Sequence, residues 1–314
     1  MSNVDLSVII PSKNNKHKTA EIIRHISENT DDLDIEFIVI DMNSSDDSVS
    51  SALQEIKSRH LKGCVIQSGK STVSSALNTG IYQSNGKYIT FVYPRKLYKD
   101  YMISYYHTIE KHNGDIVFAV PSDSSERISD ELVKDHILNQ DFIYHLAKMP
   151  FYIDLAAVML RREYLLDHHI RFFDECRLGY AEAFIYNIML FEPKAVYDNT
   201  ELQRDYVNSM SDEETVSNRA CMSRIDALIK VYEQILLCRK DDQQLVHLFE
   251  YEKIPAAVMS VVDILLKENF SCSAVKKKLH KKHYDEYLRI SSKIPSKLRY
   301  KIFKWKWIPY FYKP

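Results

Sequence analysis

The chain has 314 residues, of which 45% are hydrophobic, so it can bury the core of one large domain and a smaller one. Its formal net charge of −1 excludes a global field that would steer it towards nucleic acid or another acidic polymer. Five cysteines without CxxC spacing are typical of reduced core thiols in a cytoplasmic protein, not of a disulfide framework or a zinc site. The first residues do not resemble a signal peptide, and the most apolar segment, 256–266, is about half of a ~20-residue membrane span.

Apolar strands alternate with helix-compatible stretches in the first hundred residues. The apolar runs predict buried strands at 6–10, 35–40, 64–66 and 88–93, with helices around 19–26 and 52–56. This order predicts a parallel sheet with right-handed crossovers. Ligands of such sheets bind beyond the carboxyl ends of the strands, which places residues 11–13, Asp41 and residues 93–95 on one rim.

The pattern changes along the rest of the chain. Further strands are expected at 115–120 and 156–160, and helices at 182–190, 255–267 and 273–290. From residue 218 onward, apolar side chains recur every three or four residues and strand patterns disappear. We therefore expect an α/β domain over residues 1–217 and a helical domain, with a basic aromatic C-terminal tail, over residues 218–314.

Five segments, in order and at the expected spacing, resemble the family 2 glycosyltransferases. They are Ser7–Asn15, Phe37–Ser48 with the sequence FIVIDMNSSDDS, Ala76–Ile81, Asn85–Ile89, and Leu160–Glu175. The resemblance covers roughly residues 6–192 and implies an α/β fold of the GT-A (nucleotide-diphospho-sugar transferase-like) type. It implies a glycosyltransferase of cell-surface polysaccharide or teichoic-acid type, which moves a sugar from a nucleoside diphosphate donor to a hydroxyl.

The same resemblance assigns Pro11, Lys13, Asp41, Asn78 and Tyr93 to the donor site. A carboxylate at a strand end can accept hydrogen bonds from a pyrimidine imide or a ribose hydroxyl, and the family implies such a uridine-type contact for Asp41. The alternative is that Asp41 caps the following helix or turn. Gly86 is expected in a turn with positive φ.

One family motif is missing after the fourth strand. The Asp-x-Asp pair that normally binds a divalent cation is replaced by Tyr93-Pro94-Arg95-Lys96, so the sequence predicts no metal site of that kind and no other cofactor. The guanidinium of Arg95 can instead neutralise the donor diphosphate through two hydrogen bonds. The alternative interpretation is a decayed site with Arg95 on the surface.

The family's acidic pair that supplies the catalytic base is also altered. Glu182 matches its first member, and Ala183 stands where the usual base would be. Glu182 is therefore the candidate base of an inverting transfer, or else an anchor of its own helix. Because both motifs are altered, a catalytically inactive scaffold that binds a partner transferase, a nucleotide or a glycan is the rival hypothesis.

Both tryptophans of the chain lie among lysines in residues 297–313. Aromatic rings interleaved with basic side chains suit an anionic membrane interface, which would bring the protein to a lipid-linked or glycan acceptor at the inner face of the membrane. Packing of this tail on its own domain and a homo- or hetero-oligomeric interface are the alternatives. No basic face wide enough for nucleic acid is evident.

Overall fold

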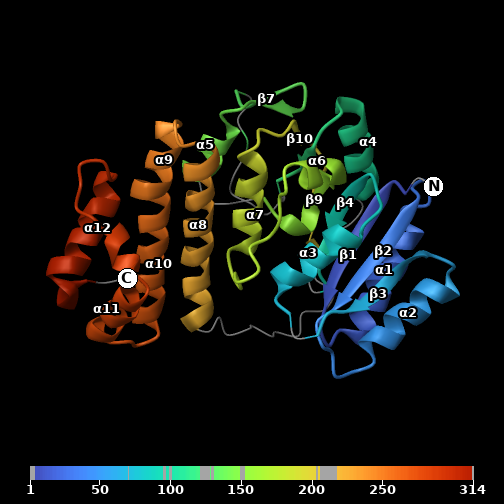
Figure 1. Ribbon diagram of the computed structural model, residues 1–314, viewed down its shortest axis with the longest axis horizontal. Coiled ribbons are helices and arrows are strands. Elements are labelled where there is room, and N and C mark those ends of the chain that lie inside the picture. The colour runs from blue at the N-terminus through green and yellow to red at the C-terminus, as the bar shows by residue number, and fades with distance from the viewer. Residues whose placement is uncertain are drawn as a thin grey trace. The chain divides into compact units, whose positions relative to one another are not determined.

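The computed structural model describes residues 4–69, 71–94, 97–98, 101–120, 128, 131–148, 153–202, 204–205 and 218–312 (Figure 1). The chain forms two compact units. The first comprises residues 1–142, 152–175 and 184–212, and the second residues 143–151, 176–183 and 213–314. The second unit thus takes two stretches from before residue 218, and the predicted boundary there stays a prediction.

A mixed sheet is the centre of the first unit. Within the described residues its strand order is β3-β2-β1-β4-β9-β6-β10-β8-β7, and a separate pair joins β5 to β11. The strands are β1 Leu6–Ser12, β2 Ile35–Asp41, β3 Lys62–Gln67, β4 Tyr88–Phe91, β5 Leu97–Tyr98, β6 Ile116–Phe118, β7 Val133–Lys134, β8 Ile137–Leu138, β9 Val158–Arg161, β10 Ala195–Tyr197 and β11 Arg204–Asp205. The predicted parallel pairing is confirmed for β1 to β4, whereas β9 runs antiparallel to both β4 and β6.

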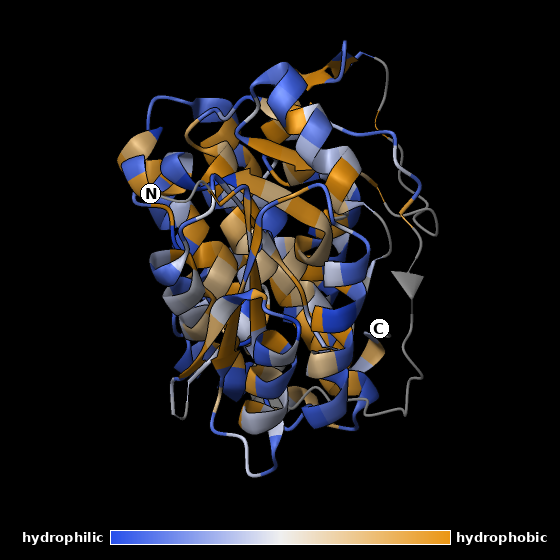
Figure 2. Ribbon diagram, turned by 90° about the vertical axis from the view of Figure 1, so that its right-hand side faces the viewer, coloured by the Kyte–Doolittle hydropathy of each residue, from blue (hydrophilic) through white to orange (hydrophobic). Residues whose placement is uncertain are grey.

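Helices cover both faces of this sheet. Those of the first unit are α1 Lys16–Glu28, α2 Ser48–Ser58, α3 Val73–Gln83, α4 Met102–His112 and α6 Arg162–Asp167, whereas α5 Phe142–Lys148 and α7 Tyr180–Met189 each begin in one unit and end in the other. Strand side chains alternate between faces, so Val8 and Ile10 share a core cluster with Ile22 of α1, while Ile9 faces α3. Figure 2 shows the strands coloured mainly as hydrophobic, as expected of a sheet buried on both faces.

Two glycines allow close approach of backbone segments. A Cβ at Gly80 would lie 2.3 Å from Cγ2 of Ile9, so α3 can pack closely on β1 only without a side chain there. The expectation of positive φ at Gly86 is wrong, because Gly86 is not among the glycines with positive φ. A Cβ at Gly86 would lie 2.6 Å from the backbone nitrogen of Ser7, so steric crowding explains the glycine.

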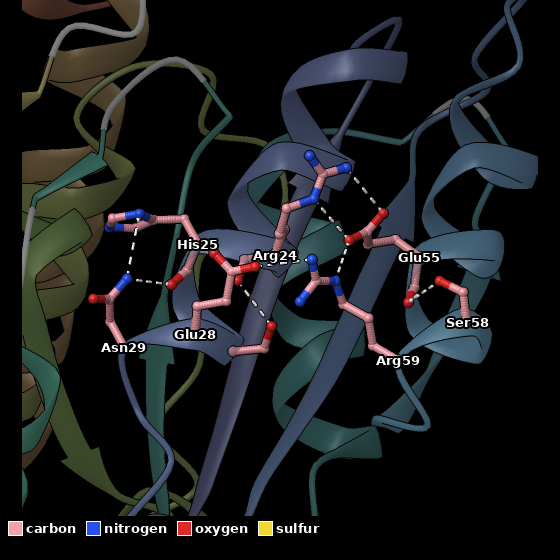
Figure 3. Close-up of polar contacts among 8 residues, drawn as sticks. Arg24, His25, Glu28, Asn29, Glu55, Ser58 and Arg59 are labelled. Atoms are coloured by element: carbon pink, nitrogen blue, oxygen red, sulfur yellow. Dashed lines mark hydrogen bonds and ion pairs between the residues drawn. The ribbon is translucent and has the colours of Figure 1, made fainter.

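Helices α1 and α2 are joined by a network of charged side chains (Figure 3). Nε of Arg24 lies 3.1 Å from Oε1 of Glu55, and Nε of Arg59 lies 2.6 Å from the same oxygen. A second nitrogen of Arg59 lies 2.9 Å from Glu28 of α1. The pKa of Glu55 is lowered, chiefly by its hydrogen bond from Arg24. These contacts fix the outer helices of the sheet's first half.

The second unit is helical and centred on α10. Its helices are α8 Asn218–Cys238, α9 Gln243–Leu248, a π-helical turn Phe249–Lys253, α10 Ile254–Lys267, α11 Cys272–Lys281, a 3₁₀ turn Tyr284–Tyr287, α12 Ser296–Trp307 and a 3₁₀ turn Pro309–Phe311. Helix α10 contacts α8, α11 and α12. The single helix predicted over residues 273–290 is wrong, because α11 ends at Lys281 and His283 adopts a left-handed conformation with φ 59°.

The prediction that the cysteines are core thiols holds only in part. Cys176 is buried, but Cys64 on the edge strand β3 and Cys238 at the end of α8 are exposed. Residues on an edge strand or at a helix end contact fewer neighbours than residues of central elements. The local sequence around a cysteine does not show which of these positions it will occupy. None of the helices in the described parts of the chain is long and apolar enough to span a membrane.

Candidate functional site

The candidate donor site lies at the carboxyl ends of the parallel strands in the first unit. Ser12, the last residue of β1, pairs in register with Asp41, the last residue of β2, and Asp41 pairs with Gln67 at the end of β3. The backbone N–H of Met42 donates to the carbonyl oxygen of Ser12 at 2.9 Å. The parallel register therefore brings Ser12 and Asp41 together on one rim, as the sequence predicted.

Asp41 is buried, with 2% of its surface exposed. Its Oδ2 accepts a hydrogen bond from the backbone N–H of Ser44 at 3.2 Å, so one oxygen does cap the turn that follows β2. Its Oδ1 is also buried and has no hydrogen-bond partner among the described residues. A buried carboxylate oxygen without a donor is unfavourable unless a ligand or solvent supplies one. Asp41 thus combines the capping role with one oxygen that no group in the described parts of the chain contacts by a hydrogen bond.

The loops after β1 and β2 hold each other in place beside Asp41. The backbone N–H of Asn14 donates to Oγ of Ser44 at 2.9 Å, and Oδ1 of Asn14 accepts from the N–H of Ser45 at 2.8 Å. The N–H of Asn15 donates to Oγ of Ser48, also at 2.9 Å. Asn14 and Asn43 adopt positive φ angles of 51° and 62°, a conformation that asparagine tolerates better than most residues. The asparagines and serines of these two segments thus supply the hydrogen bonds that join the two loops.

The other residues predicted for the donor site differ in their surroundings. Pro11 is buried in β1 opposite Ile40, and Tyr93 is half-buried two residues after β4. Lys13 is exposed directly after β1, and its ammonium forms no ion pair or hydrogen bond with another described residue. Arg95, and Lys96 beside it, lie outside the described residues.

Asn78 uses its side chain within the protein. Its Nδ2 donates to the carbonyl oxygen of Phe172 at 2.9 Å and to Oδ1 of Asp174 at 2.8 Å, while its Oδ1 accepts from the N–H of Phe172 at 2.8 Å. Oγ1 of Thr72 donates to the carbonyl oxygen of Asp174 at 2.8 Å. Helix α3 is thereby tied to the segment 172–174, and Asn78 acts within the described residues as a structural link between two of the resembling segments.

Glu182 belongs to the second unit and is 6% exposed. Its Oε2 accepts from Nε of Arg224 at 3.0 Å, and its Oε1 lies 3.3 Å from Nζ of Lys253. Burial lowers the pKa of Lys253, against the opposing effect of the Glu182 carboxylate. Ala183, at the place of the family's usual base, is fully buried. Two cations that contact one carboxylate favour the anchoring interpretation of Glu182 over the base interpretation.

Sequence reasoning missed Arg224 and Lys253. They stand 42 and 71 positions after Glu182, so no local spacing links the three residues. Lys253 also ends a π-helical turn, a feature with no sequence signature here, and its Nζ donates to the carbonyl oxygen of Leu146 at 3.4 Å. A buried ion cluster of this kind is found only once the tertiary packing is known.

The residues present do not suit a divalent cation at the position that the family implies. Mg²⁺ and Mn²⁺ prefer carboxylate and carbonyl oxygens, whereas the sequence there offers Tyr93, Pro94 and Arg95. In the described parts of the chain, no group of three or more His, Cys, Asp or Glu side chains has the arrangement of a metal site.

Comparison with known proteins agrees with this geometry. Residues 7–92 match the family model described as glycosyl transferase family 2. No curated protein matches the chain. The matched residues contain all of β1 except Leu6, the whole of β2 to β4, and Asp41 with the two loops beside it.

Solved structures of glycosyltransferases have the same fold over most of the chain. TarS 1–349 from S. aureus in complex with UDP-GlcNAc is 14% identical, with a TM-score of 0.65, and the match covers 96% of this chain and 87% of that one. The mannosyltransferase PcManGT from Pyrobaculum calidifontis, in complex with GDP-Man and Mn²⁺, is 13% identical, with a TM-score of 0.53 and coverage of 97% and 85%. The predicted GT-A-type α/β fold with a C-terminal helical region is confirmed, and so is the resemblance to family 2.

Proposed function

We propose that this chain, which has the GT-A fold and the glycosyl transferase family 2 pattern over residues 7–92, transfers a sugar from a nucleoside diphosphate donor to a hydroxyl. The observation that carries the proposal is the buried Oδ1 of Asp41, which lacks a hydrogen-bond partner among the described residues and lies on the rim where such sheets bind ligands. A pyrimidine imide N–H or a ribose hydroxyl supplies the missing donor.

The diphosphate is the second part of the proposed donor. Lys13, whose ammonium is without a protein partner in the described residues, follows β1 on the same rim as Asp41. We assign Arg95 to the diphosphate as well, because a guanidinium can bind two phosphate oxygens where the family uses a metal ion. The proposed transfer is therefore metal-independent, unlike what the Mn²⁺ in the PcManGT complex suggests for that protein.

The acceptor and the stereochemistry extend the same proposal. TarS was solved with UDP-GlcNAc and with UDP, which supports a uridine donor, and we propose a surface glycan or teichoic-acid-like acceptor, free or lipid-linked, on the cytoplasmic side of the membrane. The resemblance implies inversion at the anomeric carbon, which the configuration of the product tests. Because Arg224 and Lys253 contact the carboxylate of Glu182, we propose that Glu182 anchors α7 and that another group accepts the hydroxyl proton.

Calorimetric titration of the full chain with UDP, CDP and GDP sugars, each with EDTA and with Mn²⁺, tests the proposal. We expect binding of a uridine donor that is equal in both conditions and that weakens about tenfold or more in Arg95→Ala, because one charge-assisted contact is lost. Lys111→Ala, an exposed lysine at the end of α4, is the control and should leave affinity unchanged.

Each other outcome is informative. Binding that requires Mn²⁺ would contradict the metal-independent site while leaving donor recognition in place. An Arg95→Ala variant with unchanged affinity would remove that residue from the diphosphate site. No binding under either condition, together with capture of a second glycosyltransferase by this chain, would replace transfer with the scaffold role.

A further inference from the structure

Basic charge is concentrated at the end of the second unit. Residues 271–314 contain 13 of the 42 lysines and arginines of the chain and only two of its 43 acidic residues, although the whole chain is nearly neutral. Eleven of the 13 basic residues are lysines, which keep long flexible stems and strongly hydrated charges. This part of the protein therefore has a strong local positive field that the net charge conceals.

One side of α12 packs on its own unit. Ile302 and Trp305 are buried, and the ring of Trp305 lies 5.8 Å from that of Tyr312. The hydroxyl of Tyr312 donates to Oδ1 of Asp263 in α10 at 2.5 Å, and Lys301 also pairs with Asp263. These contacts confirm self-packing for this side only.

The other side exposes large apolar side chains. Of the 12 large hydrophobic residues that are exposed in the described parts of the chain, half lie within residues 300–311, namely Tyr300, Phe303, Trp307, Ile308, Tyr310 and Phe311. Tyr310 is 92% exposed, Phe311 77% and Trp307 69%. Such a concentration over a dozen residues is unusual for a surface that only water contacts.

Lysines of α11 lie beside this aromatic segment. The ammonium of Lys276 lies 5.6 Å from the centre of the Trp305 ring and donates to the carbonyl oxygen of Lys306 at 3.1 Å. A cavity of about 520 Å³ between the two helices is lined by Trp305 and Trp307 and by Lys276, Lys277 and Lys306. Sγ of Cys272 contacts the carbonyl oxygen of Pro309 at 3.5 Å, which places the last aromatic residues next to the start of α11.

We propose that this α11–α12 surface docks on a bilayer that contains anionic phospholipids. The surface is defined by residues Lys276, Lys277, Lys306, Trp307, Tyr310 and Phe311. Its lysines fit the phosphates of anionic headgroups, and its aromatic rings fit the boundary between headgroups and acyl chains. Charge alone does not anchor a protein stably, whereas charge and apolar insertion together do.

A bilayer fits this surface better than other partners do. In a two-fold symmetric dimer the same surface of two copies would meet, and their lysines would repel each other. A soluble polyanion would satisfy the lysines but would leave the exposed rings in water. Docking goes beyond the proposed sugar transfer and requires neither donor nor turnover.

Flotation of the full chain with vesicles tests the docking. Vesicles of phosphatidylcholine alone are compared with vesicles that contain roughly one third phosphatidylglycerol, at low salt and at about 0.5 M NaCl. We expect binding to the anionic vesicles that is at least about tenfold stronger than to the neutral ones, and that high salt weakens but does not abolish.

Two variants separate the two parts of the surface. Lys277→Glu/Lys306→Glu should weaken binding to anionic vesicles about tenfold or more, and Trp307→Ala/Tyr310→Ala/Phe311→Ala should remove the salt-resistant part. The matched controls are Lys57→Glu/Lys111→Glu and Tyr82→Ala/Leu237→Ala, which change exposed residues elsewhere and should bind like the wild type. Circular dichroism verifies folding, and Tyr310→Ala alone replaces the triple variant if that variant unfolds.

Several outcomes would overturn the docking. They are absence of vesicle binding by the wild type, equal binding to neutral and anionic vesicles, and aromatic variants that bind like their controls. Light scattering that shows a wild-type dimer and a monomeric aromatic variant would instead assign the surface to a second copy. Because no donor is present, each of these results leaves the proposed sugar transfer intact, and failure of donor titration leaves the docking intact.

Discussion

Two buried carboxylates, one in each unit, were singled out by two different motifs of the resembling family, and they differ in the charges that surround them. Asp41 of the first unit is 2% exposed, and one of its oxygens has no hydrogen-bond partner among the described residues. Glu182 of the second unit is 6% exposed, and its Oε1 also has no hydrogen-bond partner among the described residues, but that oxygen lies 3.3 Å from the ammonium of Lys253 and Oε2 accepts from Arg224. Equal burial therefore does not mean an equal role.

The contrast teaches how to distinguish a binding group from a structural one. The charge of Glu182 is compensated by cations of the protein, so removal of this charge should lower the free energy of unfolding. The carboxylate of Asp41 is only partly compensated by hydrogen bonds. Its removal should therefore lower ligand affinity and should leave the free energy of unfolding unchanged or slightly raise it.

Removal of the Glu182 charge should produce the largest effect. Glu182→Gln removes an anionic partner from the buried ammonium of Lys253, so we expect a loss of about 2–3 kcal/mol in the free energy of unfolding, measured by urea denaturation. The value is below the largest known losses because Arg224, with 44% of its side chain exposed, can be solvated instead. Glu233→Gln, in an exposed pair with Lys230, is the control and should change stability by less than about 0.5 kcal/mol.

A second variant separates anchoring from catalysis. Glu182→Gln/Lys253→Met removes both charges, and it should recover much of the lost stability. If Glu182→Gln instead kept wild-type stability and lost only turnover, the anchoring role would be wrong and the base role would stand.

Asp41→Asn tests the other half of the comparison. The amide keeps the shape of the carboxylate but removes the charge-assisted acceptor, so affinity for a uridine diphosphate sugar should fall about tenfold to a hundredfold, measured by calorimetry. The melting temperature should stay within a few degrees of the wild type or rise. Asp47→Asn, an exposed carboxylate on the same loop that pairs with Lys16, should leave donor affinity unchanged. A stability loss in Asp41→Asn as large as that of Glu182→Gln would make Asp41 structural.

Much of the first unit follows from short-range pattern. The apolar runs that end at Ile10 and Ile40 predicted β1 and β2, and the same reasoning placed Asp41 on the rim. Strand direction after β4 was not predictable, because the antiparallel entry of β9 depends on long-range pairing and not on its own residues. The helix α12 was missed because its lysines and aromatics mask a regular apolar stripe.

The site residues were predictable where they lie within one short motif, and not where their contacts depend on tertiary packing. Asp41 and the asparagine–serine loops beside it lie in short continuous motifs that can be recognised directly in the sequence. The partners of Glu182 come from helix α8 and a π-helical turn, far along the chain. Asn78 lay in a resembling motif, yet its partners, residues 172–174, are about 95 positions away, so its internal hydrogen bonds had no sequence signal.

Asn78 was predicted to bind the donor, but its side chain forms hydrogen bonds within the protein. Asn78→Ala removes the hydrogen bonds of the Asn78 side chain to the N–H and carbonyl of Phe172 and to Asp174, and we expect a loss of about 1–2 kcal/mol in unfolding free energy. Donor affinity of the folded variant should stay within about threefold of the wild type. Asn29→Ala, which loses an exposed helix-end contact to His25, should cost no more than about 0.5 kcal/mol. A large affinity loss at unchanged stability would return Asn78 to the donor site.

Substitution of Asp198 should have the smallest effect on stability. Asp198 is a third buried carboxylate, and its hydrogen-bond donors include the neutral hydroxyls of Thr108, Thr200 and Ser104. Burial opposes ionisation, but hydrogen bonds from Thr108, Thr200 and Ser104 outweigh it, so the pKa of Asp198 is lowered. A lowered pKa in the folded state stabilises the protein fully above the ordinary carboxyl pKa of about 4, and this stability is lost as the pH falls through the folded-state value. Melting temperature should therefore fall less steeply below about pH 4 in Asp198→Asn than in the wild type. The same substitution at Asp47, which is 70% exposed, should leave the acid slope almost unchanged. Equal slopes in Asp198→Asn and the wild type would show that the hydroxyl donors do not hold this carboxylate ionised.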